Sequence, residues 1–507
     1  MLVEFLLAAT LAAAGVVFLA PDRYAGKLAT GLSLLPLAGS LFMWFNFDGS
    51  GNALLGGDLA FETAAAWLRV GDYTLQWHVG VDGVSLPLLV LTTVLTTLAL
   101  VSSWTPIDER QSQFYGLMLL MEASLIGVFT ALDFFLWFVF WEGVLIPMYL
   151  LIGVWGGPRR KYAAVKFLVY TNVASLVMFL GLFALVFGLG DSLTTLGLPE
   201  IAQGVRGGDM GSFAGLDPAT LKLGAFVAMF AGFAVKVPVV PFHTWLPDAH
   251  VEAPTPVSVI LAGVLLKMGT YALLRFNFTM LADIAQANAA IIAAFGVVSV
   301  IYGAFLALAQ RDLKRIVAYS SISSMGYVIL GLVAFTPHGI GGATFQMISH
   351  GLVSGLMFMV VGVIYNATHT RMVGDMSGMA DRMPWTVGIF VAAAFGYMGL
   401  PLMSGFAGEV LVFIGSFHST VLPGAPVFTA LAMFGIVVVA GYLLWAMQRT
   451  LFGPYELETD YEVGPAPFHD VAPLAVLLLL VVVLGVAPDL AYGMIQDAIE
   501  PLLGGGV

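Results

Sequence analysis

The most constraining feature of this sequence is a recurrence of apolar stretches of about 20 residues, the length that an α-helix needs to cross a bilayer core. About fourteen such stretches follow one another along the chain. They are apolar on all sides, and they do not alternate apolar with polar residues as membrane β-strands do. Their centres lie near residues 10, 37, 94, 122, 144, 176, 234, 266, 298, 326, 354, 400, 438 and 480. The pattern predicts an all-α membrane protein with about fourteen transmembrane helices.

Composition excludes several other classes of protein. Hydrophobic residues make up 60% of the 507 residues and charged residues only 10%, so a soluble surface cannot be built. The chain has no cysteine, which excludes disulfides, iron–sulfur ligation and zinc–cysteine sites. A net charge of -12 argues against nucleic acid as a partner. Residues 1–20 resemble a signal peptide, but Glu4 replaces the usual basic region, so we expect a retained first span.

The order of the predicted spans indicates four regions. Spans one to three and an external loop occupy residues 1–110, and span fourteen with the tail occupies residues 453–507. Between them we expect two five-helix repeats, spans four to eight in residues 111–280 and spans nine to thirteen in residues 281–452. An odd number of spans in each unit would invert the second repeat relative to the first. The longest polar stretches, residues 48–82 and 191–220, are predicted to be loops.

The distribution of the 19 lysines and arginines predicts the orientation. Twelve of them, Lys314 among them, fall in odd-numbered loops, and four fall in even-numbered loops: Arg69, Arg206, Lys222 and Arg275. Because basic loops stay in the cytoplasm, both termini should lie on the outer, periplasmic side of a bacterial cytoplasmic membrane. The remaining three, Lys166, Lys236 and Lys267, lie inside predicted spans.

Seven ionisable residues lie within predicted spans, where a charge costs about 2.5–3.5 kcal/mol and needs a partner, water or a function. They are Glu122, Glu142, Lys166, Lys236, Lys267, His350 and Glu409. Carboxylates, amines and imidazoles are groups that pass protons along a hydrated path. The sequence contains no GxxxxGK[ST], GxGxxG or HExxH motif. This set therefore indicates a proton relay rather than a catalytic centre or a metal site.

Two predicted spans contain prolines beside these charges. In span seven Lys236 is followed by Pro238 and Pro241, which would free the carbonyls of Ala234 and Val237. In span twelve Pro401 precedes Glu409. Interrupted spans at matching positions of two halves are typical of an ion site between inverted repeats.

Structural roles compete with the relay for several of these residues. Lys166 lies close to a basic cluster and could snorkel to the surface. Glu122 could be a neutral interhelical contact, and His350 a packing histidine. His243 and His250 flank the end of span seven, where they could be relay exits or helix caps. Packing alone is a weaker explanation for three charges next to helix breaks: Lys236, Glu142 and Glu409.

Four long segments resemble the antiporter-like membrane subunits of respiratory complex I. They are VGVDGVSLPLLVLTT (79–93), FWEGVLIPMYLLIGVWG (140–156), KVPVVPFHTWLPDAHVEAPTPVSVILAGVLLKMG (236–269) and RDLKRIVAYSSISSMGYV (311–328). Within that family the chain is most similar to chain M of bacterial NADH–quinone oxidoreductase, the counterpart of mitochondrial chain four. Glu409 carries this distinction, because chains L and N and the related antiporters usually have lysine there. The segment after the last span is also too short for the lateral helix of chain L. One position departs from the family pattern, since Ser324 stands where many members have histidine, and water or Ser324 itself would bridge that gap.

The resemblance implies a role for each central residue. Glu142 would pair with and tune Lys236, Lys267 would connect toward the second half, and Glu409 would release protons on the far side. Flavin mononucleotide, iron–sulfur clusters and quinone would reside in other subunits, so no cofactor is expected in this chain. Its partners would be other membrane subunits, especially chains L and N, together with lipids. A subunit of a multisubunit cation/proton antiporter is the alternative function, and a structural scaffold is a third.

Overall fold

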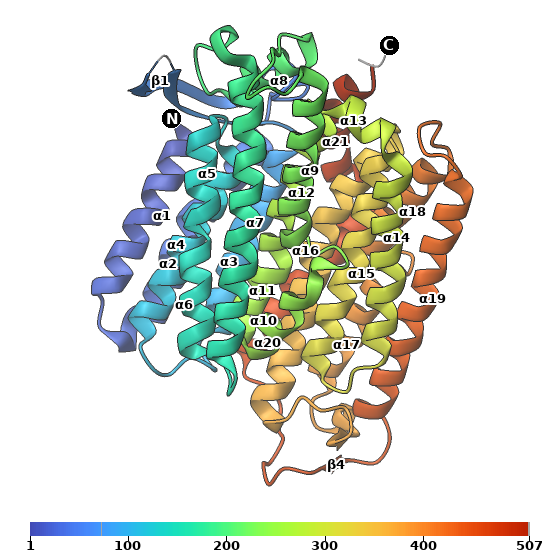
Figure 1. The fold of residues 1–507 in the computed structure, drawn as a ribbon. Helices are drawn as coiled ribbons and strands as arrows, with labels where there is room; N and C mark the ends of the chain where they lie inside the picture. The colour runs from blue at the N-terminus through green and yellow to red at the C-terminus, as the bar shows by residue number, and fades with distance from the viewer. Residues whose placement is uncertain (72, 505–507) are drawn as a thin grey trace.

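A computed structural model describes residues 1–71 and 73–504 as a bundle of upright helices (Figure 1). Thirteen helical segments of the described chain are long and apolar enough to cross a membrane. The predicted twelfth span is present as two shorter apolar helices, α17 and α18. The predicted all-α membrane fold is therefore confirmed, and the N-terminus and the last helix, α21, lie at the same end of the bundle (Figure 1). We call this end the terminal face.

The N-terminal region packs two spans and a β-hairpin beside a third span. Its elements are α1 (Leu2–Leu19), α2 (Asp22–Phe45), β1 (Ala60–Val70), β2 (Tyr73–Val81) and α3 (Ser85–Ser102). The prediction of a plain loop over residues 48–82 is wrong, because β1 and β2 pair in antiparallel register from Ala60↔Val81 to Val70↔Tyr73. Part of the support for this hairpin comes from distant residues, since the Thr74 N–H donates to the Thr194 carbonyl at 3.0 Å. Such long-range pairing is not visible in local sequence patterns.

The next region contains predicted spans four to eight. Its elements are α4 (Gln111–Thr130), α5 (Phe134–Gly143), α6 (Leu145–Trp155), α7 (Arg160–Leu189), η1 (Gly190–Ser192), α8 (Leu198–Gly207), α9 (Pro218–Lys236), η2 (Phe242–Thr244), α10 (Trp245–Glu252), α11 (Thr255–Ile260), η3 (Leu261–Leu265), α12 (Leu266–Ala272) and η4 (Leu273–Met280). The stretch 191–220 was also predicted as a loop, and it contains the short helix α8. Aspartates start two of these helices, because the carboxylates of Asp133 and Asp217 accept first-turn N–H groups of α5 and α9.

The following region contains predicted spans nine to thirteen and is joined to a C-terminal pair of helices. Its elements are α13 (Ala282–Ala287), α14 (Ala289–Leu308), α15 (Leu313–Val333), α16 (Pro337–Thr368), β3 (Met376–Ser377), η5 (Met379–Asp381), α17 (Pro384–Tyr397), α18 (Ser404–Phe417), α19 (Ala425–Thr450), β4 (Glu456–Leu457), α20 (Phe468–Val486) and α21 (Asp489–Gly504). The apolar windows of α16 and of span eight are 100% buried, whereas those of α2 and α20 are 28% buried. Two central spans are therefore enclosed by protein, and α2 and α20 are peripheral.

A buried ion pair joins the terminal-face loops to span eight. Arg275 was predicted to lie in a loop, but it is buried in η4, where its Nη2 lies 2.5 Å from Asp82 Oδ1. The same guanidinium donates to Asn52, whose side-chain amide donates to the Ala498 carbonyl in α21. Burial raises the pKa of the Asp82 carboxyl, but Arg275 and backbone N–H groups outweigh it and hold this pKa below its usual range. The stabilisation is therefore present above about pH 4 and is lost as the pH falls through the lowered pKa.

We expect Arg275→Met to destabilise the chain by about 3–5 kcal/mol, because it leaves the Asp82 carboxylate buried without a counter-charge. The double variant Arg275→Met/Asp82→Asn should be less destabilised than Arg275→Met alone. The new amide keeps an oxygen that can accept the Val84 and Ser85 N–H groups but carries no charge. Thermal unfolding midpoints of the purified protein measure both effects. A double variant as unstable as the sum of the two single variants would contradict the pairing.

Candidate functional site

Helix α9 ends at Lys236, where the prolines of span seven interrupt the backbone ladder. The Ala234 carbonyl, which loses its partner to Pro238, accepts instead from the Val239 N–H at 2.7 Å. The neighbouring Val235 carbonyl accepts from the Trp245 indole N–H at 2.8 Å. The break predicted at Lys236 is therefore present, and protein groups satisfy part of the backbone that it opens.

Lys236 is buried against α5, the helix that carries Glu142. Its Nζ lies 5.1 Å from the centre of the Trp141 ring, a distance typical of a cation–π contact. Glu142 is half-buried and is close enough to interact electrostatically with Lys236. No carboxylate oxygen in the described chain lies within 4.0 Å of Lys236 Nζ. The predicted pair is thus brought together without a direct ion pair.

Lys267 lies in α12, a short α-helical stretch between the π-helical segments η3 and η4. Its Nζ donates to the Ala262 carbonyl at 2.6 Å and lies 2.6 Å from His350 Nδ1. When Lys267 is protonated its ammonium can only donate, so the imidazole nitrogen then accepts in this contact. Both side chains are buried, and they come from the first and the second predicted repeat. The Lys267–His350 contact therefore connects the two halves of the chain.

A cluster of hydroxyl groups lies between His350 and Glu409. The rings of His350 and Tyr397 meet edge to face with centroids 5.9 Å apart, and the Tyr397 hydroxyl lies 3.3 Å from Ser321 Oγ. The Tyr442 hydroxyl donates to Ser320 Oγ at 2.6 Å and interacts electrostatically with Glu409. Sequence reasoning missed these two tyrosines because they lie in apolar spans and were counted as hydrophobic. A hydroxyl in a predicted span is the signal that could have found them.

Glu409 lies on α18 beside the break of span twelve. Helix α17 ends at Tyr397 and α18 begins at Ser404, so the predicted interruption at Pro401 is present. The Glu409 carboxylate packs against Gly399, whose φ of +63° is in the left-handed region. Its Oε2 is buried without a hydrogen-bond partner in the described chain. This carboxylate is enclosed by protein at the interrupted helix.

A second group of buried bases extends from Lys267 toward the face opposite the termini. The His250 ring stacks on Phe358 with centroids 4.3 Å apart, and it interacts electrostatically with Lys267 and Lys314. Lys314 was predicted to lie in a loop, but it is buried at the start of α15 and donates to the Ala253 carbonyl at 2.8 Å. The charges of Asp312 and Arg371 lie close enough to act on Lys314, and these two side chains pair with each other at 2.5 Å.

Four weaker candidates lie apart from the Lys267–His350 contact. Lys166 donates to Asp248 Oδ2 at 2.7 Å, and Arg315 shares that carboxylate. His243 is buried beside tyrosine rings, and neither carboxylate oxygen of the fully buried Glu122 has a hydrogen-bond partner in the described residues. Ser324 is buried on α15. The tyrosine hydroxyls instead bond Ser320 and Ser321, one turn earlier on the same helix. Across residues 1–71 and 73–504 no cluster of His, Asp and Glu is suited to a metal ion.

Comparisons with known proteins agree with this architecture. Residues 131–435 match the family described as "NADH:quinone oxidoreductase/Mrp antiporter, TM". The chain is 42% identical to NAD(P)H-quinone oxidoreductase chain 4 1 of Nostoc sp. over 438 residues, which are 85% of this chain and 78% of the relative. It is 39% identical to F(420)H(2) dehydrogenase subunit M of Methanosarcina mazei over 475 residues, covering 93% and 91% of the two chains.

Solved structures show the same fold. A chain of respiratory complex I from Thermus thermophilus with bound NADH superposes with a TM-score of 0.86 and 26% identity, covering 100% of both chains. A chain of the Mrp complex from Dietzia sp. DQ12-45-1b gives a TM-score of 0.82 at 20% identity over 99% of both chains, a likeness of fold alone.

We expect Gly399→Ala to disturb Glu409, because a Cβ at this position would overlap the carboxylate and the left-handed backbone costs about 1–2 kcal/mol in other residues. The matched control is Gly388→Ala on α17, where a Cβ meets open space. The carboxyl infrared band of Glu409, identified by its loss in Glu409→Gln, should shift in Gly399→Ala only. An unshifted band in Gly399→Ala would contradict the packing.

Proposed function

The chain belongs to the NADH:quinone oxidoreductase/Mrp antiporter transmembrane family, and from this premise we propose that it is a proton-translocating, non-redox membrane subunit of an NADH–quinone oxidoreductase. The observation that carries the proposal is the buried Lys267–His350 contact of 2.6 Å, which joins a series of ionisable groups reaching from Lys236 to Glu409. Burying so many titratable groups is expensive, and ionisable groups within a membrane typically mark ion or proton pathways. Quinone reduction in other subunits would drive the transfer.

The proposed path consists of two half-channels, one for each five-helix repeat. The breaks α9/α10 and α17/α18 would be equivalent elements of inverted repeats, with Lys236 and Glu409 at their centres. The carboxylate of Glu142 stabilises the protonated form of Lys236 when it approaches and favours release of the proton when it withdraws. Lys267 donates toward His350 Nδ1, and the Tyr397 and Tyr442 hydroxyls extend the path toward Glu409.

Lys314 and His250 are the proposed inlet of the second half-channel. They lead from the face opposite the termini to Lys267, and each interacts electrostatically with the next group in this series. Lys314 is the member nearest the surface, where Asp312 and Arg371 flank it. Glu409 would release the proton to the terminal face.

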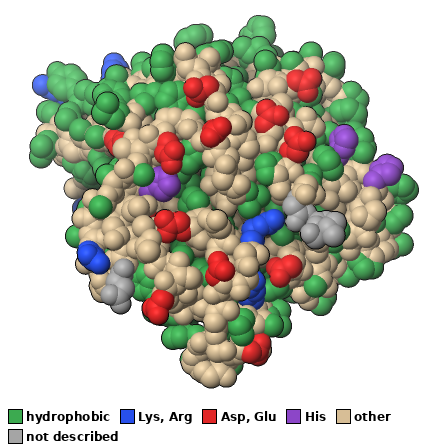
Figure 2. Space-filling view, turned by 90° about the horizontal axis from the view of Figure 1, so that it is seen from above, with side chains coloured by type: hydrophobic (Ala, Val, Ile, Leu, Met, Phe, Trp, Pro, Cys, Tyr) green, Lys and Arg blue, Asp and Glu red, His purple; other side chains and the backbone are tan. Residues whose placement is uncertain are grey.

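The proposed orientation places the terminal face on the periplasmic side of a bacterial cytoplasmic membrane. Seen from above, the charged side chains of this face are acidic more often than basic (Figure 2). Cytoplasmic loops are enriched in lysine and arginine, so an acidic face is consistent with an outer location. The proposed neighbours are the antiporter-like chains L and N, and other subunits would hold flavin mononucleotide, iron–sulfur clusters and quinone.

We expect Lys236→Met and Glu142→Ala to assemble normally but to lower NADH–quinone turnover and proton transfer to about a tenth or less, since a positioned proton-transfer group contributes about 10²–10⁴-fold. The matched control is Lys222→Met, which removes a lysine at the other end of the same helix α9, where it bonds the Val205 carbonyl. Proton transfer is measured by dye quenching in reconstituted vesicles. Normal pumping in both variants would overturn the proposed function.

The alternative, a subunit of a multisubunit cation/proton antiporter, is distinguished by co-purification. A pull-down of the tagged chain should recover NADH dehydrogenase activity if it belongs to a quinone reductase, and none if it belongs to an exchanger. A scaffold role predicts a third outcome, in which charge-neutral substitutions change the yield of the complex but leave the ratio of protons to electrons unchanged.

A further inference from the structure

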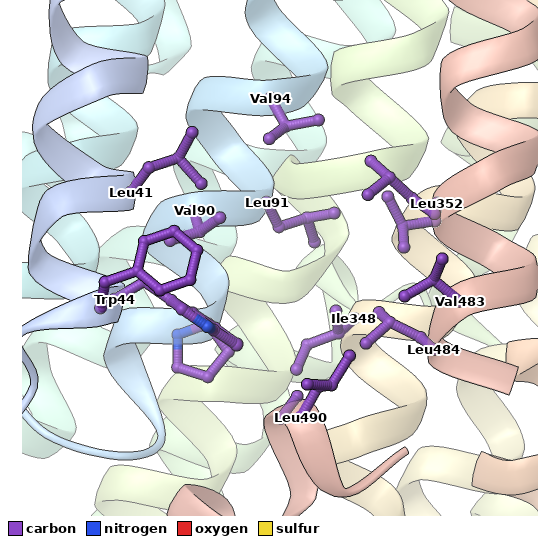
Figure 3. A pocket seen from close by; sticks show the side chains of 14 residues that line it. Leu41, Trp44, Val90, Leu91, Val94, Ile348, Leu352, Val483, Leu484 and Leu490 are labelled. Atoms are coloured by element: carbon purple, nitrogen blue, oxygen red, sulfur yellow. The ribbon is translucent and has the colours of Figure 1, made fainter. Parts of the chain in front are cut away.

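An apolar pocket of about 300 Å³ opens on the side of the bundle, away from the proposed proton path. It lies between peripheral helices α2 and α20, and α3 and α16 form its inner wall. Figure 3 shows Leu41 and Trp44 on one side, Val483 and Leu484 on the other, and Leu490 of α21 at one end. Since α2 and α20 are the least buried spans, the pocket is continuous with the apolar outer surface of the bundle.

The lining determines the kind of ligand that the pocket can hold. Its residues are hydrophobic throughout, so water inside would lack hydrogen-bond partners, and an apolar cavity of this size takes an apolar guest. Along α3 the lining runs from Pro87 to Val94, which spans about 10 Å of helix. The pocket therefore extends from the membrane interface toward its interior, in the direction of a lipid acyl chain.

The rim at the terminal face carries negative charge. Asp489 directly precedes the lining residue Leu490, and Asp48 follows the lining residue Phe45 by three positions; both aspartates are exposed. No lysine or arginine occurs between Lys27 and Arg69 or after Arg449, so the segments that form this rim contain no basic residue. An anionic headgroup would be repelled here, whereas an ammonium group would be attracted.

We propose that this pocket binds one acyl chain of an aminophospholipid of the phosphatidylethanolamine type, with its ammonium group facing Asp48 and Asp489. The site is structural and involves no covalent step. Its inner wall includes Ile348 and Leu352 of α16, so the bound chain would pack against the helix that carries His350.

The test uses the purified complex in bilayers containing a trace of phosphatidylethanolamine with a photoactivatable diazirine in the upper part of one acyl chain. Labelled peptides are mapped by mass spectrometry, and a phosphatidylglycerol probe with the same acyl chain is run in parallel. We expect the peptides with Val90 and Leu484 to be labelled about fivefold more by the ethanolamine probe, which corresponds to ~1 kcal/mol for an interfacial charge. Leu484→Trp should fill the pocket and abolish this labelling, whereas Leu479→Trp, on the exposed side of α20, should not.

The charged rim is tested by Asp48→Asn/Asp489→Asn, which should remove the preference for ethanolamine, with Asp497→Asn as the matched control on α21. Equal labelling by both probes on the unmodified chain would overturn the headgroup assignment, even if Leu484→Trp fails to assemble. Labelling that persists in an assembled Leu484→Trp would overturn the pocket as the site. Cross-linking of a photoactivatable residue at Val90 to a neighbouring subunit, with no lipid label, would show that protein occupies the pocket.

Discussion

The free-energy cost of holding an ionisable side chain within a membrane is the constraint on which the rest of this structure depends. The chain lowers this cost by surrounding the ionisable side chains with protein. Span eight and α16, which carry Lys267 and His350, are the two spans whose apolar windows are 100% buried. The peripheral spans form the outer surface of the bundle. In the centre, the titratable groups have one another, backbone carbonyls and hydroxyls as neighbours.

Irregular helix geometry supplies the polar groups that these side chains need. A regular α-helix uses all its interior carbonyls, so a lysine inside a span finds no acceptor on its own helix. Here the Lys267 side chain donates to the carbonyl of Ala262, which lies in the π-helical segment before it. The interruptions at Lys236 and Glu409 similarly bring loop backbone to membrane depth, where protein encloses it. Lys236, Lys267 and Glu409 thus lie where the helices are interrupted or flanked by π-helical segments.

Much of the fold could be predicted, because length and hydropathy decide which segments cross a membrane. Thirteen of the predicted spans are present in the described chain, and the twelfth is present as two shorter helices. Prolines predicted the breaks after Lys236 and around Pro401, and both breaks are present. The β-hairpin and α8 were not predicted, since the hairpin is partly held by residues more than a hundred positions away. Arg275 and Lys314 were predicted to lie in loops, because a charged residue near the end of an apolar stretch is typical of a loop. Their polar partners, Asp82 for Arg275 and the Ala253 carbonyl for Lys314, are remote in sequence.

The sequence by itself determined the membrane class, the number of spans and the identity of the central charges, because each follows from local hydropathy or from a proline. It also carried the resemblance to the complex I subunits, which the comparisons confirm. Only the tertiary structure decided which charges meet. The 2.6 Å contact between Lys267 and His350, the tyrosines between His350 and Glu409, and the pocket between α2 and α20 all join residues from separate helices. Helix packing sets those distances, and one-dimensional patterns do not record it.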